Sequence, residues 1–544
     1  MKEQSIHTGT TSQTLMQTIA VFMKQRWELF VLLIIFIICK TPHLHYPFYW
    51  DESWPYAPAV KQMYMHGPSL MPDAVDSLLS RGHPLFFHAA AAAWMDIFGT
   101  TQVVIHSFAL FVSIAFLIAI HEACFSLYNR RVAVLSTVLV AIQVMYFVQS
   151  SLLLFEIMVA FLAFLSIYFY TTRRYLLTAL FLSLLFYTKE SGIIAGIAIG
   201  MDVAVRLFSK ERVQEKVMRM VAVAVPFAAI AIFFLIQKHL RGWYVFPLYS
   251  DNLEHTWGAF YIKFRSTLFN VFTLDHRYYY FNLLLALSVL IAVVKRNICY
   301  AVLLLPAVCI YIMSNDNLAQ HTYSRLMFGL LVLSSLYANY TLARLKYGTR
   351  TQQTQFILLG TVFSICFLAF SSVNLFLIYR YLFPVIILML VFSGIYLDEL
   401  IRALNKALFY PVLVVLLLIG FFTFKLDAGH GDTNLGAFHA MHVQQSAVSY
   451  MEKTGDYNAP IGVGGFLVQQ HLLDSNTGFL RLGRNFTDVD WRITDNTKYI
   501  ITDNIEPSNL YERLNADTSF HRVYRYEEGD TWTEIYKRSG RPKP

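Results

Sequence analysis

Two adjacent carboxylates, Asp51 and Glu52, stand in an aromatic segment near the start of the chain. The segment follows the first apolar stretch and reads Tyr46-Pro47-Phe48-Tyr49-Trp50-Asp51-Glu52-Ser53-Trp54. Tryptophans are typical of the membrane–water interface, and a loop there needs no carboxylates to anchor a helix. The acidic pair therefore indicates chemistry at a membrane surface, with Asp51 the first choice for a general base.

Other polar residues fall at the ends of apolar stretches, on the same predicted face of the membrane as the acidic pair. They are His83, Glu156, Lys189-Glu190, Asp275-His276-Arg277, His321, Arg325 and Tyr379-Arg380-Tyr381. A charge near mid-membrane costs about 2.5–3.5 kcal/mol on insertion scales, so charges in such segments usually have a partner or a function. The presence of positive and negative side chains from several apolar stretches on one face favours a site for an anionic, lipid-linked substrate.

Each of these residues also has a purely structural interpretation. Lys189 and Glu190 can extend along apolar surface to the interface. Glu156 can be held by an ion pair with Lys189 or Arg380. Arg325 and Arg380 can anchor lipid headgroups. The gathering of these groups at one face favours the functional interpretation.

The composition predicts the element type that must position these residues. Of 544 residues, 56% are hydrophobic and only 14% are charged, whereas soluble domains carry about 25% charged residues. Apolar windows of about 20 residues predict about thirteen spans. They lie near 27–43, 102–124, 132–150, 152–171, 175–189, 191–208, 217–238, 279–294, 297–314, 324–343, 354–376, 379–397 and 407–425. The stretch 84–99 is short for a span and is expected to lie along the interface or to re-enter.

Basic residues indicate the orientation of these spans. Clusters between them all fall on one side, which the positive-inside rule makes cytoplasmic; they are Lys24/Arg26, Arg130/Arg131, Arg173/Arg174, Lys210 to Arg219, Lys295/Arg296, Arg344/Lys346/Arg350 and Arg402/Lys406. The net charge of +8 mostly follows this rule and does not indicate nucleic acid. The first span is expected to be a retained signal anchor. The five cysteines lie in or beside spans, so no disulfide framework is predicted.

The predicted fold class is an all-α polytopic membrane domain followed by a small α/β domain. We expect a cytoplasmic segment 1–26, a transmembrane domain 27–425 with a catalytic outer loop at 44–101, and an exported domain 426–544. In that last domain, 461–465 and 499–502 predict buried strands, and 435–453 and 508–515 predict helices. Its glycines lack the spacing of a dinucleotide fingerprint, and a tight strand-to-helix turn is expected instead.

Several motifs in order resemble GT-C membrane glycosyltransferases, most closely the branch of protein O-mannosyltransferases and lipid A aminoarabinose transferases. The resemblance covers about residues 27–400. It rests on Trp50-Asp51-Glu52, Gly82-His83-Pro84-Leu85-Phe86-Phe87, Leu152-Leu153-Leu154-Phe155-Glu156, Tyr187-Thr188-Lys189-Glu190-Ser191-Gly192 and Arg380-Tyr381-Leu382-Phe383-Pro384. It implies transfer of a sugar from a polyprenyl-phosphate carrier to a lipid, glycan or protein hydroxyl on the non-cytoplasmic face, with inversion.

The resemblance also implies roles for individual residues. Asp51, with Glu52 beside it, matches the family's loop carboxylate, and Glu156 falls where a second acidic residue is found. Lys189 matches a basic residue near the carrier phosphate. His276 resembles a metal-binding histidine, but the aminoarabinose branch has Glu-Lys where this chain has Gly82-His83. The missing Glu leaves a divalent metal an open question, and the role of the Lys passes to His83.

The residue types agree with this chemistry. The departing phosphate is a weak base, so it needs cationic stabilisation rather than a strong acid; Lys189, Arg380, Arg325 and His83 are the candidates. Asp51 would act as base and Glu156 would orient Asp51, the acceptor or a sugar hydroxyl. The absence of a long luminal insert in the tail favours a bacterial inner membrane.

Two other functions remain as alternatives. A transporter or flippase of a lipid-linked saccharide would also bind polyprenyl phosphate, but would carry polar groups at the midplane and repeated, broken spans. A non-catalytic scaffold would keep the fold without the activity. Charges at one face favour an enzyme over a transporter.

Overall fold

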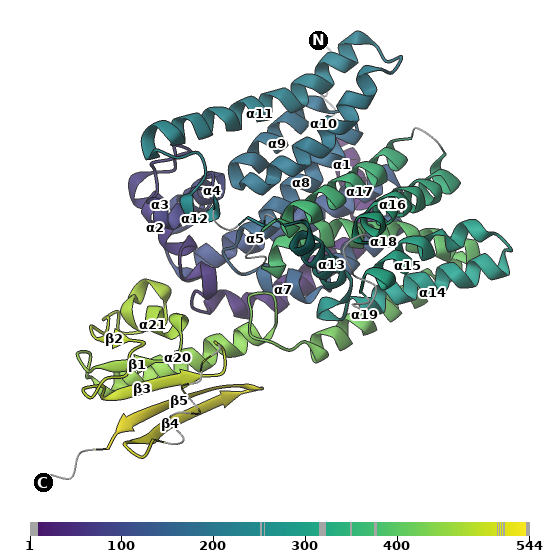
Figure 1. Cartoon of the computed structure of the whole chain (residues 1–544). Helices are drawn as coiled ribbons and strands as arrows, with labels where there is room; N and C mark the ends of the chain where they lie inside the picture. The colour runs from purple at the N-terminus through teal and green to yellow at the C-terminus, as the bar shows by residue number, and fades with distance from the viewer. Residues whose placement is uncertain are drawn as a thin grey trace, which may run out of the picture.

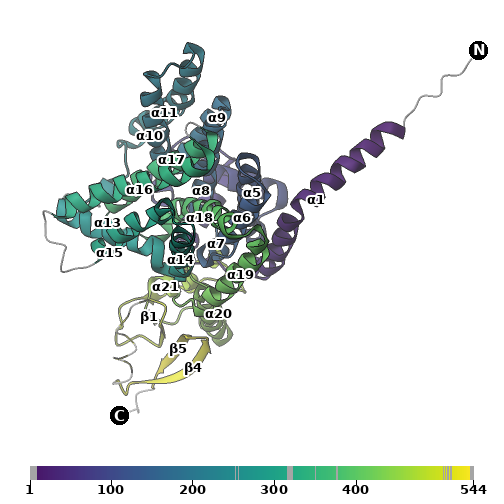
Figure 2. The ribbon, with the colours of Figure 1, turned by 90° about the vertical axis from the view of Figure 1, so that its right-hand side faces the viewer.

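The computed structural model describes residues 9–250, 253–254, 256–314, 323–348, 351–374, 378–506, 508, 510, 512, 514 and 517–539. A helical bundle carries a small sheet domain at one end (Figure 1). Helix α1 (Gly9–Lys40) projects from the side of the bundle, as Figure 2 shows. We call the end of the bundle beside the sheet domain the domain end, and the opposite end the distal end.

Short elements at the domain end form the first loop. They are η1 (Thr41–His45), η2 (Trp50–Glu52), α2 (Tyr56–His66), α3 (Ser77–Ser80) and α4 (Phe86–Phe98). Helix α4 has 13 residues, which extend about 20 Å, so it is too short to cross a hydrocarbon layer of about 30 Å. This agrees with the expectation that the stretch 84–99 does not span.

The bundle follows the first loop. Its first half consists of α5 (Gln102–Leu127), α6 (Arg130–Ala141), α7 (Val144–Gln149), α8 (Phe155–Thr171), α9 (Tyr175–Thr188), η3 (Glu190–Gly192), α10 (Ile193–Leu207), α11 (Val213–Arg241) and α12 (Pro247–Ser250). Its second half consists of α13 (Trp257–Thr273), η4 (Leu274–His276), α14 (Tyr278–Val294), η5 (Ile298–Leu303), α15 (Leu304–Ser314), α16 (Tyr323–Tyr347), α17 (Gln352–Ser372), η7 (Tyr379–Leu382), α18 (Phe383–Leu404), η8 (Lys406–Leu408) and α19 (Phe409–Leu426).

Every apolar stretch predicted as a span is mostly helical where it is described, which confirms the predicted fold class for this part of the chain. In the described part, seven helices are long and apolar enough to cross a membrane by length and composition. Helices α13 and α14, which meet at an angle of 97°, would make an eighth as one broken span. The remaining predicted spans correspond to shorter helices, such as α8 and α9, or to pairs separated by a break, such as α6 and α7.

Helix α18 forms the centre of the bundle, because most of its side chains are buried against α6, α8, α14 and α17. Gly394 allows the close approach of α6, since a Cβ atom there would lie 2.4 Å from Oγ of Ser136. Ser136 in turn donates a hydrogen bond to the carbonyl of Val391, at 3.2 Å. The turn η7 opens α18 at the domain end.

The C-terminal domain is a five-stranded sheet with helices. It consists of α20 (Gly436–Thr454), β1 (Ile461–Val463), α21 (Phe466–Leu473), η9 (Ser475–Thr477), β2 (Val489–Asp490), β3 (Tyr499–Asp503), β4 (Phe520–Glu528) and β5 (Thr531–Arg538). The strand order is β2-β1-β3-β5-β4. Strand β1 runs parallel to both of its neighbours, and β5 runs antiparallel to both of its own. The small α/β domain predicted from the sequence is confirmed.

The predicted strand-to-helix turn lies between β1 and α21. Gly465 is the last residue before α21, and a Cβ atom there would lie 2.2 Å from a carboxylate oxygen of Glu506. That oxygen accepts a hydrogen bond from the backbone N–H of Leu467, at 2.8 Å. A carboxylate of the chain therefore covers the N-terminus of α21, where a dinucleotide fold would hold phosphate. The helix predicted over 508–515 falls partly outside the described residues.

Candidate active site at the domain end

Arg380 is the centre of a charged cluster at the domain end. Its side chain is 2% exposed and three carboxylates from three segments face it. Nη2 donates to Asp51 of η2, and Nη1 donates to Asp432. Nε lies 3.5 Å from Oε1 of Glu156, in the first turn of α8. Asp432 belongs to residues 427–435, between α19 and α20, which form neither helix nor strand; we call this segment the connector.

Lys189 brings a second cation to the cluster. It follows the last residue of α9, and its extended backbone turns the chain away from the helix. Its Nζ lies 3.3 Å from Oε1 of Glu156 and 4.2 Å from the ring centroid of Tyr381. The other oxygen of Glu156, Oε2, is buried and has no hydrogen-bond partner among the described residues. A buried carboxylate oxygen without a partner is costly, which points to a ligand group or water at this position.

The two acids of the first loop have different surroundings. The side chain of Asp51 is 20% exposed, whereas that of Glu52 is 0% exposed. Oε1 of Glu52 accepts from the N–H of Leu153 at 2.7 Å and lies 2.8 Å from Nε2 of His106. Oε2 accepts from the N–H of Tyr49 at 3.2 Å. Asp51 thus lies where a substrate has access, while Glu52 binds the first loop to the segment before α8.

His83 lies beside Lys189 but pairs with a different acid. Its Nδ1 lies 2.7 Å from Oε2 of Glu190, and its ring contacts that of Phe155 at a centroid distance of 5.6 Å. The ring of Phe155 also lies 5.6 Å from Nζ of Lys189. His83 and Lys189, both predicted to bind the donor phosphate, therefore lie beside one aromatic side chain.

Three of the predicted polar residues make no described contact with this cluster. The side chain of Arg325 and the whole of His321 lie outside the described residues. His276 has its Nε2 atom 3.1 Å from the carbonyl oxygen of Leu426 and its Nδ1 atom 3.3 Å from the hydroxyl of Tyr278. Among the described residues, no group of three or more His, Cys, Asp or Glu side chains is arranged to hold a metal ion.

Asp432 is the member of the cluster that the sequence analysis missed. The segment Gly429-His430-Gly431-Asp432 follows the last predicted span, at 407–425, and no role was predicted for it. In the structure this linker folds back onto the first loop, because the carbonyl oxygen of His430 accepts from the hydroxyl of Tyr49, at 2.6 Å, and from Nε1 of Trp50, at 3.4 Å. A carboxylate seven residues after the end of the last predicted span was the available signal.

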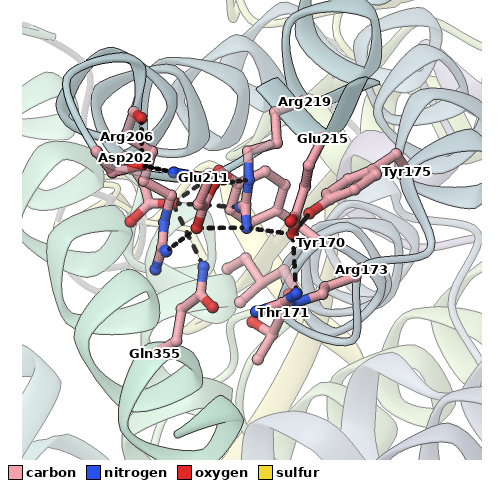
Figure 3. Close-up of polar contacts among 12 residues, drawn as sticks. Tyr170, Thr171, Arg173, Tyr175, Asp202, Arg206, Glu211, Glu215, Arg219 and Gln355 are labelled. Carbon is pink, nitrogen blue, oxygen red and sulfur yellow. Dashed lines mark hydrogen bonds and ion pairs between the residues drawn. The ribbon is translucent and has the colours of Figure 1, made fainter. Parts of the chain in front are cut away.

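A second charged network lies at the distal end (Figure 3). Its centre is Arg219, which is 1% exposed and lies 3.2 Å from both Glu211 and Glu215. Arg206 pairs with Asp202, at 2.7 Å. The network joins the ends of α8, α9, α10, α11 and α17 through Tyr170, Thr171, Arg173, Tyr175, Asp202, Arg206, Glu211, Glu215, Arg219 and Gln355. Its three arginines face three carboxylates, so it is charge-balanced and anchors helices rather than offering a site.

A cavity of about 340 Å³ lies among α13 to α18 and is lined mostly by apolar side chains. Its few polar side chains include Asn339, which donates to Thr361 at 2.6 Å and accepts from the hydroxyl of Tyr396 at 2.8 Å. Neither Arg380 nor Asp51 lines this cavity. The cavity and the charged cluster are therefore separate features of the bundle.

No protein-family model matches the chain, and no curated protein matches it. Among solved structures, ArnT from Cupriavidus metallidurans bound to undecaprenyl phosphate is similar, with a TM-score of 0.46 and 13% identity over 94% of this chain and 97% of that chain. The oligosaccharyltransferase AglB from Archaeoglobus fulgidus, in complex with an inhibitory peptide and a dolichol-phosphate, has a TM-score of 0.43 and 13% identity over 96% of this chain and 75% of that chain. The Pmt1-Pmt2 protein O-mannosyltransferase complex from S. cerevisiae, bound to the sugar donor, has a TM-score of 0.31 and 16% identity over 45% of this chain and 36% of that chain.

These proteins are GT-C glycosyltransferases, the class that the sequence motifs resemble. All three TM-scores are below 0.5 and all three identities are below 25%. The comparisons therefore identify what the chain is similar to, and they assign no role to any of its residues.

Proposed function

We propose that the protein is a GT-C-type glycosyltransferase that moves a sugar from a polyprenyl-phosphate donor to a hydroxyl acceptor, with inversion at the sugar. The observation that carries the proposal is the cluster around Arg380. It combines a partly exposed acid, Asp51, with the buried cation Arg380 and the largely buried cation Lys189 at the end of an apolar helical bundle. This is the combination that a charged headgroup on a lipid tail requires.

In the proposed reaction, the acceptor oxygen forms a bond to the anomeric carbon while the bond from that carbon to the phosphate oxygen breaks. The acceptor proton passes to the carboxylate of Asp51, on the face of the sugar opposite the phosphate. The electron pair of the broken bond stays on the phosphate oxygen. Arg380 and Lys189 stabilise the negative charge that develops there. Polyprenyl phosphate and the glycosylated acceptor are the products.

Glu156 has the role of orienting the substrate in this proposal. One of its oxygens is held by Lys189, and the buried Oε2 has no partner among the described residues. A sugar hydroxyl is a donor that suits this oxygen. His83, paired with Glu190, supports the phosphate-binding side next to Phe155. We assign no step to a metal ion.

The bundle provides apolar surface for the polyprenyl tail, and the cavity among α13 to α18 supports this role because its lining is mostly apolar. For the orientation, we propose that the distal end faces the cytoplasm of a bacterial inner membrane. This is supported by basic side chains at the distal end, including Arg130, Arg131, Arg206, Lys346 and Arg402, and by the positive-inside rule. The C-terminal domain is then extracytoplasmic and adjoins the acceptor.

The proposal is tested by sugar transfer with the purified full-length protein in nanodiscs. The donors are polyprenyl-phosphate mannose, glucose, galactose and aminoarabinose, each offered with water or a short hydroxyl acceptor. Release of polyprenyl phosphate together with a glycosylated or hydrolysed sugar is the expected result. Movement of an intact donor across a vesicle membrane, without cleavage of any donor in the panel, would instead identify a transporter.

A further inference from the structure

Arg380 is predicted to bind the donor phosphate, yet chain carboxylates already occupy its guanidinium. Asp51 and Asp432 accept from its two Nη atoms, and Glu156 lies 3.5 Å from its Nε. A guanidinium binds carboxylate and phosphate through the same fork of N–H donors. A phosphate therefore reaches Arg380 only if one of these carboxylates gives up its position.

The charges of the cluster lead to the same conclusion. Two cations, Arg380 and Lys189, face three carboxylates. Addition of an anionic phosphate to an already anionic group of side chains brings like charges within a few ångströms in a poorly solvated place, which is unfavourable. Departure of one carboxylate as the phosphate arrives restores the balance.

The three carboxylates differ in how firmly the fold holds them. Glu156 lies in a helix and is 3% exposed. Asp51 lies in a helical turn next to Glu52, which three contacts hold in place. Asp432 lies in the connector, whose residues form neither helix nor strand. Asp432 is therefore the carboxylate that moves at the lowest cost in broken backbone hydrogen bonds.

Resting on the function proposed above, we propose that the Asp432 carboxylate stands in for the donor phosphate on Arg380, and that the connector is a latch which the phosphate of a polyprenyl carrier displaces. Arrival of the donor then breaks the ion pair of Asp432 and releases the middle of the connector.

The latch links the donor site to the C-terminal domain. The carbonyl oxygen of His430 accepts hydrogen bonds from Tyr49 and Trp50 of the first loop. The Nδ1 atom of the His430 ring lies 3.1 Å from the hydroxyl of Thr531 in β5. A movement of Asp432 is thus transmitted both to the loop that carries Asp51 and to the sheet. Donor binding and acceptor access are coupled through one segment of nine residues, 427–435.

The first test measures binding of farnesyl phosphate and undecaprenyl phosphate to the full-length protein in nanodiscs. Asp432→Asn removes the competing charge but keeps an oxygen that accepts from Arg380. The expected result is binding at least about tenfold tighter than wild type, within the range seen when one member of a close charge pair is removed. The matched control is Asp456→Asn, which removes a surface carboxylate of the C-terminal domain, paired with Lys498, and leaves binding unchanged.

The second test needs no variant. Hydrogen exchange of wild-type peptides that cover 427–435 is expected to rise on addition of undecaprenyl phosphate and to stay constant with inorganic phosphate at the same concentration. Slower exchange in the connector, or weaker binding by Asp432→Asn, would overturn the latch. Equal binding by the two proteins with unchanged exchange would overturn it as well.

The two proposals fail in different ways. If neither wild type nor Asp432→Asn binds a polyprenyl phosphate, the proposed donor class is wrong and the latch falls with it. If wild type binds the carrier but Asp432→Asn binds it equally and the connector does not respond, only the latch is wrong.

Discussion

Arg380 donates a hydrogen bond to Asp51 although 329 residues separate the two in the chain. One residue lies in the turn that opens α18, and the other lies in the first loop after α1. The cluster therefore forms only when the beginning and the end of the helical bundle have both folded. Four predictions follow from the contacts around this pair, from the connector and from the network at the distal end.

Replacement of Asp51 by asparagine is expected to lower the transfer rate by about 10²–10⁴-fold, the usual contribution of a general base. Binding of polyprenyl phosphate is expected to persist, because the two cations remain. Single-turnover transfer and carrier binding in nanodiscs measure the two effects separately. Asp73→Asn, an exposed change in the same loop, is the control. Transfer by Asp51→Asn within about tenfold of wild type would contradict the role of Asp51 as base.

Replacement of Glu52 by glutamine is expected to act on stability. One oxygen of Glu52 would become an amide that faces a backbone N–H, so a buried donor would lose its acceptor at a cost of about 1–3 kcal/mol. Thermal unfolding in detergent, compared with Asp51→Asn, measures this cost. An unchanged melting temperature combined with lost transfer would show that Glu52 acts in the chemistry, as the sequence analysis predicted.

The different surroundings of Asp51 and Glu52 could not be predicted from the sequence. A regular helix or strand has a period that tells which side chains share a face. The residues Trp50–Glu52 form a single turn of 3-10 helix, and no period distinguishes its two acids. Asp432 was missed for a related reason. It lies in the connector, 52 residues after Arg380 in the chain, and no local sequence pattern indicates that the two side chains meet.

The apolar stretches and the charges at their ends were predictable because the membrane imposes them. Burial of backbone in lipid requires helices, and the stretches predicted as spans are mostly helical where described. Glu156, Lys189 and Arg380 were expected to meet because each ends or begins an apolar stretch on one face, and they do. The number of full-length spans was harder to predict, because apolar composition does not distinguish a spanning helix from a short buried one such as α9 (Tyr175–Thr188).

The connector is expected to respond to pH through Asp427. Burial raises the pKa of this carboxyl to about 6 from an ordinary value of 3.8, although hydrogen bonds from Leu435 and Asn434 favour the charged form. The folded chain therefore binds a proton that the unfolded chain has released. The resulting stabilisation is complete below the ordinary value and is lost as the pH rises through about 6.

Unfolding of wild type and Asp427→Asn between about pH 4.5 and about pH 7.5 measures this effect. Wild type is expected to lose about 1 kcal/mol relative to the variant as the pH rises, after discounting for solvent screening of a partly exposed group. The asparagine mimics the protonated carboxyl and does not titrate. A constant difference between the two proteins over the whole range would show that Asp427 does not hold its proton.

Arg219→Met is expected to destabilise the bundle by about 1–3 kcal/mol, because three partly buried carboxylates lose their central cation. Arg173→Met is the matched control. Arg173 also pairs with Glu215, but its side chain is 58% exposed, so its loss is expected to cost about 0–1 kcal/mol. Chemical or thermal unfolding measures both. Folded Arg219→Met is expected to bind polyprenyl phosphate as wild type does, since the network lies at the distal end; weaker binding would show that the two ends are coupled.

The hydrogen bonds from Tyr49 and Trp50 to the carbonyl of His430 affect where a domain boundary should be drawn in chimeric proteins. A boundary drawn after Leu426, where the last apolar helix ends, would assign Asp432 and His430 to the C-terminal domain. A chimera joined there would give Arg380 a foreign connector and leave two donors of the first loop without their acceptor. Functional grafts should therefore carry residues 427–435 together with the bundle, so that the seam falls at the start of α20 (Gly436–Thr454).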